Sequence, residues 1–276
     1  MSALTLTLKS PPTLRVDASG LAPERLYGLK SGEVARLKLG LGNEAVPVGD
    51  LFAVTGDDAA DIRFRGATDK FDFLGREMRR GRLSLEGDAG AYLGRAMSGG
   101  EIALSGHAGP WAATALGGGR ISITGDAGEG LGGALPEDRY GMNGGIVIVG
   151  GRAGNRAGDR MRRGIIAIAG NAGDYAGSRM IAGTLVVMGA VLGQGAGAFP
   201  GFGMKRGTLL FRHPPARMLP TFRDGGRHEL GFLALLRRTL EEAGAPSALT
   251  RDMAVPARRF TGDAAFDGRG EILVLG

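Results

Sequence analysis

The stretch GREMRRGRLSLEGDAGAYLGRAMSGGEIALSGHAG, residues 75 to 109, contains two successive copies of one pattern. The consensus is G-x-Φ-x-Φ-x-G-x-A-G-x-x-x-G-x-x-M-x-x, where Φ is apolar, and its period is 19 residues. Each copy has a ladder residue three positions before a ladder glycine, from Gly81 to Gly207. The ladder residues are Met78, Met97, Leu116, Met142, Met161, Met180 and Met204. A fixed period of this length predicts that one structural unit is stacked on copies of itself.

A short strand is predicted at the start of every copy. Apolar residues stand at the second and fourth positions after each ladder glycine, for example Leu83 and Leu85. This alternation is typical of a strand with one buried face. Helical repeats would need a period of 3.6 residues, and each interior glycine would cost them about 1 kcal/mol. We therefore expect an all-β fold, a right-handed parallel β-helix that forms a single-stranded solenoid of 19-residue coils.

Small residues mark two more columns of the repeat. A glycine two residues after each strand, such as Gly87, is expected to let the chain turn through positive φ. The alanine two residues later, such as Ala89, suits a narrow interior, and the methionines suit irregular slots between these columns because the side chain is unbranched. Two copies are longer than the rest, within 129–141 and within 192–203, and solenoids accommodate such insertions as loops.

The sequence outside the repeat divides the chain into three parts. Residues 1–60 are predicted to form an N-terminal β cap, residues 61–213 the glycine-repeat β-helix, and residues 214–276 a C-terminal cap. The last part contains an amphipathic helix from His228 to Ala243, followed by short strands. Because exposed strand edges invite pairing with other chains, we expect these segments to cover the two ends of the stack.

The composition limits the possible chemistry. The 276 residues include no cysteine, which leaves out disulfides, thiolate metal sites and cysteine nucleophiles and assigns any redox step to a partner. The net charge of +6 favours acidic partners. With one Trp, four Tyr and no recognition helix, we expect no nucleic-acid binding. The N-terminus lacks the pattern of a signal peptide, and we expect a cytoplasmic chain with no membrane segment.

No motif for catalysis or for binding a metal or cofactor stands out. The GQGAG segment at 193–197 is followed by Pro200 and does not begin a nucleotide-binding helix. Glu101 and Asp126 have no matching acids in adjoining columns, although glycoside cleavage needs two facing carboxylates. The histidines are His107, His213 and His228, and no pair has metal-ligand spacing. We expect no catalytic residue and no metal ligand in this chain, and we interpret His107 and Asp126 as corner residues.

One set of charged residues recurs in a single register. Basic pairs stand directly before three ladder glycines, and we call this set the arginine edge: Arg79, Arg80, Arg162, Arg163, Lys205 and Arg206. Two interpretations are open. The row protects an exposed edge and keeps a glycine-rich protein in solution, or it contacts an acidic partner or carrier.

The flanking sequences and the repeat together resemble a known family. The segments at 29–56, 62–81 and 140–164, the last reading YGMNGGIVIVGGRAGNRAGDRMRRG, are similar to the C subunit of formylmethanofuran dehydrogenase through almost the whole chain. The repeat is also similar to the C-terminal glycine-repeat domain of glutamate synthase large subunits. The Ala, Gly and Arg content favours the bacterial branch of the family, which belongs to a formyltransferase/hydrolase complex.

This resemblance implies a structural subunit in tetrahydromethanopterin-linked one-carbon metabolism. Its partners would be a formyltransferase subunit (D), an amidohydrolase-like subunit (A) and a B subunit. The methanofuran-type carrier, tetrahydromethanopterin and metal ions are expected on those partners, with none bound by this chain. The alternatives are the C subunit of a redox-active formylmethanofuran dehydrogenase, a carrier-binding surface on the arginine edge, and a spacer like that of glutamate synthase.

Overall fold

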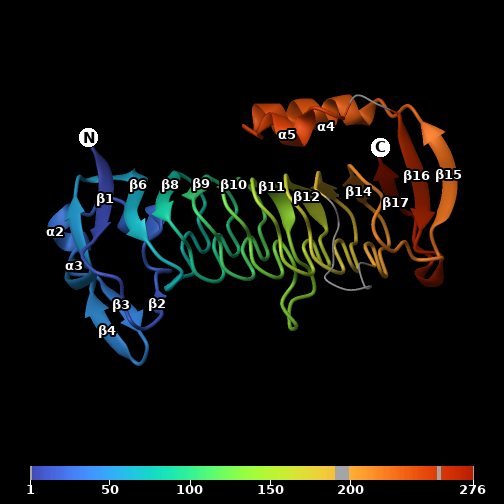
Figure 1. Ribbon diagram of the computed structural model, residues 1–276. Helices are drawn as coiled ribbons and strands as arrows, with labels where there is room; N and C mark the ends of the chain where they lie inside the picture. The colour runs from blue at the N-terminus through green and yellow to red at the C-terminus, as the bar shows by residue number, and fades with distance from the viewer. Residues whose placement is uncertain (1, 190–198, 254–255, 276) are drawn as a thin grey trace.

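The computed structural model describes residues 2–189, 199–253 and 256–275, and it is mostly β structure with few helices (Figure 1). The strands of its main sheet are β1 (Ala3–Leu8), β5 (Phe52–Thr55), β6 (Asp58–Ala67), β8 (Arg82–Gly87), β9 (Glu101–Ser105), β10 (Arg120–Ile123), β11 (Asn143–Val149), β12 (Arg163–Ile168), β13 (Thr184–Val187), β14 (Thr208–Phe211), β15 (Arg223–His228), β16 (Ala257–Gly262) and β17 (Gly270–Val274). Within the described residues their order is β15-β16-β17-β14-β13-β12-β11-β10-β9-β8-β6-β1-β5. The result is an elongated stack of coils.

The parallel strands of the stack pair in the register that the repeat predicts. Leu83 lies beside Ile102, and Ile102 lies beside Ile121, so equivalent residues of successive copies are neighbours. The alanine column forms a second, shorter ladder of parallel bridges that joins Ala89 to Ala108 and continues to Ala172. Coils in this part of the stack therefore bond to their neighbours on two sides. The apolar residues at the second and fourth positions after each ladder glycine, such as Leu83 and Leu85, face one continuous core.

The two ends of the sheet contain more strands than the repeat alone predicts. β1 lies parallel to β6, with Leu4 beside Ile62, and β17 lies parallel to β14, with Ile272 beside Leu209. Antiparallel strands then follow at both ends, β5 on β1 and β16 with β15 on β17. Beyond the predicted rungs, strands from both ends of the chain thus extend the parallel series.

A small second sheet and three short helices flank the first coil. The sheet contains β2 (Val16–Asp17), β3 (Lys38–Leu41), β4 (Glu44–Pro47) and β7 (Phe71–Asp72). The helices are α1 (Pro23–Leu26), α2 (Ser31–Val34) and α3 (Val48–Leu51). The aromatic rings of Phe52, Phe64 and Phe71 pack together beneath these elements, with centroids 5.7 Å and 5.3 Å apart for the two pairs that contain Phe52. This segment therefore shares the core of the stack.

The ladder methionines lie inside the stack, and each one packs against the ladder glycine of the next coil. All seven ladder residues are fully buried. A Cβ atom built on Gly119 would lie 2.7 Å from Met97 Cε, and one built on Gly164 would lie 2.7 Å from Met142 Cε. The ladder glycine is needed because the methionine of the preceding coil occupies the space of a side chain.

The corner glycines are required for a different reason from the one the sequence indicated. Positive φ occurs at Gly87, but it does not occur at Gly125 or Gly170. A Cβ atom on Gly125 would lie 2.6 Å from the carbonyl oxygen of Gly106, and one on Gly170 would lie 2.6 Å from that of Gly151. The close approach of successive coils, rather than the turn itself, excludes a side chain there.

The C-terminal helix lies along the side of the stack, and the expectation that it covers the end was wrong. Helix α4 (Phe232–Glu242) and helix α5 (Ser247–Thr250) lie beside β11 to β14 in Figure 1. Leu233, Leu236 and Leu240 pack in one cluster with the outward-facing residues Val186 and Leu210. In β8 to β10 the equivalent outward residues are small or polar, so only the later coils present an apolar outer face for the helix.

Some sequence features lie outside the described residues. These are the GQGAG segment at 193–197 and most of the longer copy at 192–203. The other insertion is described, and it projects from the stack beside β11 (Figure 1). Among the described residues, no helix combines the length and the apolar character that crossing a membrane requires.

Candidate functional site: a polar corner and an arginine edge

Polar side chains line one corner of the stack and bond each coil to the next. Asp88 Oδ1 accepts a hydrogen bond from the backbone N–H of His107 at 2.8 Å, and Asp126 Oδ1 accepts one from that of Arg152 at 2.7 Å. Three residues further along the coil than Arg152, Asn155 Oδ1 accepts a similar hydrogen bond from the backbone N–H of Asp174 at 2.9 Å. These side chains therefore accept hydrogen bonds from the backbone of the following coil and link successive coils.

His107 belongs to the same ladder, as the sequence interpretation of a corner residue implied. Its side chain is exposed, and its Nδ1 accepts a hydrogen bond from the backbone N–H of Asp126 at 3.0 Å. No cluster of His, Cys, Asp and Glu that could hold a metal ion occurs in the described parts of the chain.

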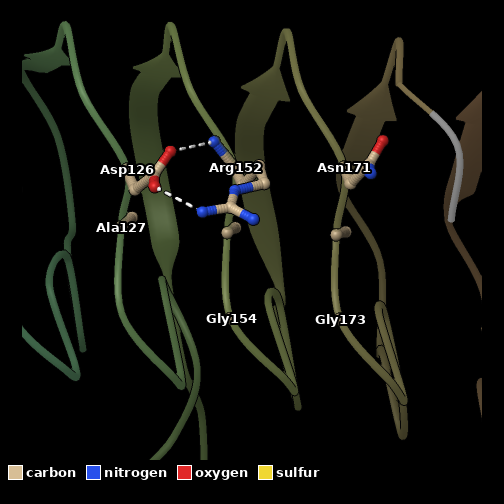
Figure 2. Close-up of a pocket in the computed structure, with 8 residues that line it drawn as sticks. Asp126, Ala127, Arg152, Gly154, Asn171 and Gly173 are labelled. Atoms are coloured by element: carbon tan, nitrogen blue, oxygen red, sulfur yellow. Dashed lines mark hydrogen bonds and ion pairs between the residues drawn. The ribbon is translucent and has the colours of Figure 1, made fainter. Parts of the chain in front are cut away.

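The corner widens into a hollow of about 410 Å³ around Asp126, Arg152 and Asn171, floored by alanine and glycine (Figure 2). The guanidinium of Arg152 lies 3.2 Å from Asp126 Oδ2. The backbone hydrogen bond from Arg152, together with this guanidinium, holds the pKa of the Asp126 carboxyl below its ordinary value. The carboxylate is therefore ionised at neutral pH and already accepts two hydrogen bonds, an arrangement that suits a structural residue better than a general base.

The arginine edge lies where strands β8, β12 and β14 begin, and Arg163 is the first residue of β12. Arg162 and Arg163 are two strands away from Lys205 and Arg206, which is about 10 Å, whereas Arg79 is four strands away from Arg162, about 19 Å. The structure thus brings the second and third pairs close together and leaves the first pair apart. The backbone N–H groups of Arg79 and Arg80 both bond to Glu24 Oε1 of α1.

The side chains of the arginine edge have no acidic partner among the described residues. None of the six makes an ion pair or a side-chain hydrogen bond with the described parts of the chain. Arg80 lies over the Tyr27 ring, 5.3 Å from its centroid, and Arg162 lies over the Tyr140 ring at 4.9 Å. Elsewhere many arginines are paired, for example Arg15 with Asp72.

Sequence reasoning missed one further member of this row. Arg269 directly precedes Gly270, and Gly270 takes the place of a ladder glycine in the coil of β17, because a Cβ atom there would meet the side chain of Met204. Arg269 is exposed and bonds through its backbone N–H to the carbonyl of Lys205 at 2.7 Å. The sequence pattern does not reveal Arg269, because the 19-residue spacing is lost here: residues 212–262 separate this coil from the previous one.

A buried ionic cluster, also missed, holds the loop at 129–141. The Asp159 carboxylate, 3% exposed, accepts hydrogen bonds from Arg179 Nε at 2.9 Å and Ser178 Oγ at 2.6 Å. Arg160 lies 3.3 Å from the same carboxylate and donates to the carbonyls of Asp138 and Leu135 at 2.6 and 2.8 Å. One buried acid thus orients two arginines, and Arg160 fixes the loop.

The fold and the site define a glycine-repeat β protein. Its coils are joined by two ladders of backbone bonds, separated by columns of glycine and linked at a polar corner.

No protein-family model matches the chain. A segment of 86 residues is 39% identical to the C subunit of the formyltransferase/hydrolase complex Fhc of Methylorubrum extorquens, covering 31% of this chain and 32% of that one. A segment of 93 residues is 32% identical to the C subunit of a tungsten-containing formylmethanofuran dehydrogenase of Methanothermobacter thermautotrophicus, covering 32% and 34%.

The matched segments span about a third of these curated relatives, but the structural likeness is more extensive. A chain in the crystal structure of the FhcABCD formyltransferase/hydrolase complex of Methylorubrum extorquens, solved with methylofuran, has a TM-score of 0.90 and 39% identity and covers 99% of both chains. This chain therefore belongs to the family that contains the C subunits of the Fhc complex and of formylmethanofuran dehydrogenase.

Proposed function

We propose that this chain is a non-catalytic scaffold subunit of a formyltransferase/hydrolase complex in tetrahydromethanopterin-linked one-carbon metabolism. The observation that supports this most is the match at 39% identity over 99% of both chains with a chain of the FhcABCD complex. The partners would be the formyltransferase subunit (D), the amidohydrolase-like subunit (A) and the B subunit. The carrier, tetrahydromethanopterin and metal ions would be bound by those partners.

The proposed role agrees with how the polar groups of the coils are used. Asp88, Asp126 and Asn155 each accept a hydrogen bond from the next coil, and Asp159 is engaged by arginines. Such groups hold the stack rigid, and a rigid stack offers long surfaces at a fixed spacing. We further propose that the stack is a right-handed parallel β-helix and that residues 1–60 and 214–276 flank the repeat at 61–213 as caps, the second through its strands rather than through α4.

The scaffold role is tested by co-expressing the partner subunits with and without this chain. We expect the catalytic subunits to co-purify as one complex only when the chain is present, and the isolated chain to show no transferase or hydrolase activity. An intact, fully active complex assembled without the chain would refute the proposal. Subunits of a tungsten or molybdenum dehydrogenase among the co-purifying proteins would instead identify the redox-active alternative.

A second candidate role, contact with an acidic carrier, is favoured by one observation. The six side chains of the arginine edge make no ion pairs with described residues, so their charge is available to an anion. In the assembled complex, the double variant Arg162→Glu and Arg163→Glu should raise the KM for the carrier at low salt. The difference should shrink at high salt, because mobile ions screen exposed charges.

A matched control changes the net charge equally on another surface. Arg237→Glu and Arg238→Glu lie on α4, where both arginines are paired with glutamates one turn away. These variants should leave the KM close to that of the wild type. If both double variants behave alike, the arginine edge does not contact the carrier.

A further inference from the structure

Several positions of the coil have left-handed backbone conformation, and one of them is occupied by an aromatic residue in several coils. The φ angles are 60° at Phe73, 65° at Tyr92, 62° at Trp111 and 59° at Tyr175. In the coil between Trp111 and Arg156 the same position is Gly130, with φ of 72°. Left-handed conformation is strained for bulky side chains, and glycine adopts it freely. Aromatic residues at this position therefore need an explanation beyond the backbone.

The first three aromatic residues of this column have partners within the stack. The rings of Phe73 and Tyr92 are stacked, with centroids 4.8 Å apart and planes 6° apart. The Trp111 ring lies over Gly130, where a Cβ atom would lie 2.6 Å from Trp111 Cζ3. Packing between neighbouring coils accounts for these three.

Tyr175 is different, because it belongs to an exposed group of rings. Its ring lies 6.4 Å from that of Phe202, edge to face, and Phe202 lies 5.4 Å from Phe266 in the same manner. We call these three residues the aromatic patch. Their exposed fractions are 37%, 40% and 46%, so each ring remains partly open to solvent although it packs against its neighbour. Exposed aromatic side chains gathered from three separate segments are typical of a protein interface.

Two arginines border the aromatic patch. Arg156 and Arg179 line a hollow of about 210 Å³ together with Tyr175, Ser178 and Phe202. Arg156 makes no ion pair with any residue that the structure describes. The carboxylate that holds Arg179 is buried and is shared with Arg160. The rim of the hollow therefore has an excess of positive charge.

The side chains around the hollow are held in place before any partner arrives. Arg179 donates its backbone N–H to the carbonyl of Phe202 at 2.6 Å and its guanidinium to Asp159. Asp263 Oδ2 accepts a hydrogen bond from the backbone N–H of Gly203 at 3.0 Å and begins the short 3₁₀ helix η1 (Ala264–Phe266) that carries Phe266. A preorganised surface loses little conformational entropy on binding, which favours affinity.

We propose that the aromatic patch and its arginine rim are the docking site for an acidic segment of a partner protein. An apolar side chain of that segment would lie among the rings, and its carboxylates would bind Arg156 and Arg179. Tyrosine and arginine dominate the binding energy of many interfaces. This inference rests on the proposed scaffold function, and it names the surface through which the chain binds a partner in the complex.

The test replaces Tyr175 with glycine, which suits a φ of 59° and removes the ring without a backbone penalty. The dissociation constant between this variant and the co-expressed partner subunits, measured by isothermal titration calorimetry, should rise at least tenfold, while its unfolding temperature stays at or above that of the wild type. Arg156→Glu should weaken binding to a similar extent. Tyr92→Gly is the matched control, since the backbone is the same and the residue lies outside the patch; its dissociation constant should stay within threefold of the wild-type value.

The outcomes separate the two proposals. If the wild-type chain binds the partner subunits and both Tyr175→Gly and Arg156→Glu bind equally well, the docking site is wrong and the scaffold function stands. If the wild-type chain binds none of them, both are wrong. If Tyr175→Gly abolishes only self-association of the chain, the patch binds a second copy and the docking proposal is overturned.

Discussion

Replacing a ladder glycine by alanine tests whether the spacing of the coils, rather than the backbone angle, requires glycine. Gly119 and Gly226 both have φ of +83°. A Cβ atom on Gly119 would lie 2.6 Å from the carbonyl oxygen of Gly100 and 2.7 Å from Met97 Cε, whereas one on Gly226 would have nothing within 4 Å. The two substitutions share the backbone strain and differ only in the available space.

The expected losses of stability follow from these two terms. Left-handed alanine costs about 1–2 kcal/mol, part of which is offset by the lower entropy of the unfolded chain, so Gly226→Ala should cost about 1 kcal/mol. Overpacking adds about 1–3 kcal/mol, so Gly119→Ala should cost about 2–4 kcal/mol. The Gly100 carbonyl cannot easily move away, because it accepts a hydrogen bond from the backbone N–H of Arg120 at 3.0 Å.

The assay is urea unfolding followed by far-UV circular dichroism, with the free energy of unfolding compared among the variants. Gly183→Ala gives an intermediate case, since its nearest neighbours are the flexible Met161 Cε at 2.9 Å and a carbonyl oxygen at 3.2 Å. We expect losses in the order Gly226, Gly183, Gly119. Equal losses for Gly226→Ala and Gly119→Ala would refute the claim that close packing of the coils excludes side chains at the ladder position.

Three further predictions concern the core and the charged residues. Met161 is fully buried, so Met161→Ala should lower the free energy of unfolding by about 2–5 kcal/mol and Met161→Leu by less than about 1.5 kcal/mol, as measured by urea unfolding. Asp159→Ala should cost about 3 kcal/mol, because it removes the buried acceptor that Ser178, Arg160 and Arg179 share. Arg152→Ala, at an exposed ion pair, should cost less than about 1 kcal/mol in the same assay. The pKa of Asp126 is lowered in the folded state, so its contribution is present above the unfolded pKa of about 3.9 and is lost as pH falls through the folded pKa. Acid titration of thermal unfolding should therefore show a steeper loss of stability below pH of about 4 for the wild type than for Asp126→Asn, and parallel curves would contradict this assignment.

Much of the coil could be predicted because every copy repeats the same local contacts. The strands and their register follow from Leu83, Ile102 and Ile121, which recur at the period of the coil. The reason for the corner glycines was wrong, since a pattern of residues does not distinguish a special φ from a close neighbour. The aromatic column of Phe73 and Tyr92 also recurs at 19 residues, so the sequence alone contains the signal for it.

The position of α4 could not be predicted from the helix alone. Its apolar face requires a partner, and either the end or the side of the stack would serve. The outward-facing residues of the strands decide where α4 packs. They are polar at Ser84 and Ser122 but apolar at Ile148, Val186 and Leu210. Burial of apolar surface favours the later coils, since covering the earlier ones would bury hydroxyl groups.

The sequence by itself determined the period, the parallel stacking and the identity of the columns, because contacts between neighbouring coils repeat at a fixed separation along the chain. Only the tertiary structure decided the contacts that have no period. It alone brings Phe266 onto Phe202 beside Tyr175, sets Arg160 against the loop at 129–141, and makes Arg269 part of the basic row. These contacts depend on where insertions and the returning C-terminal segment settle, which is governed by packing of the whole molecule rather than by any local pattern.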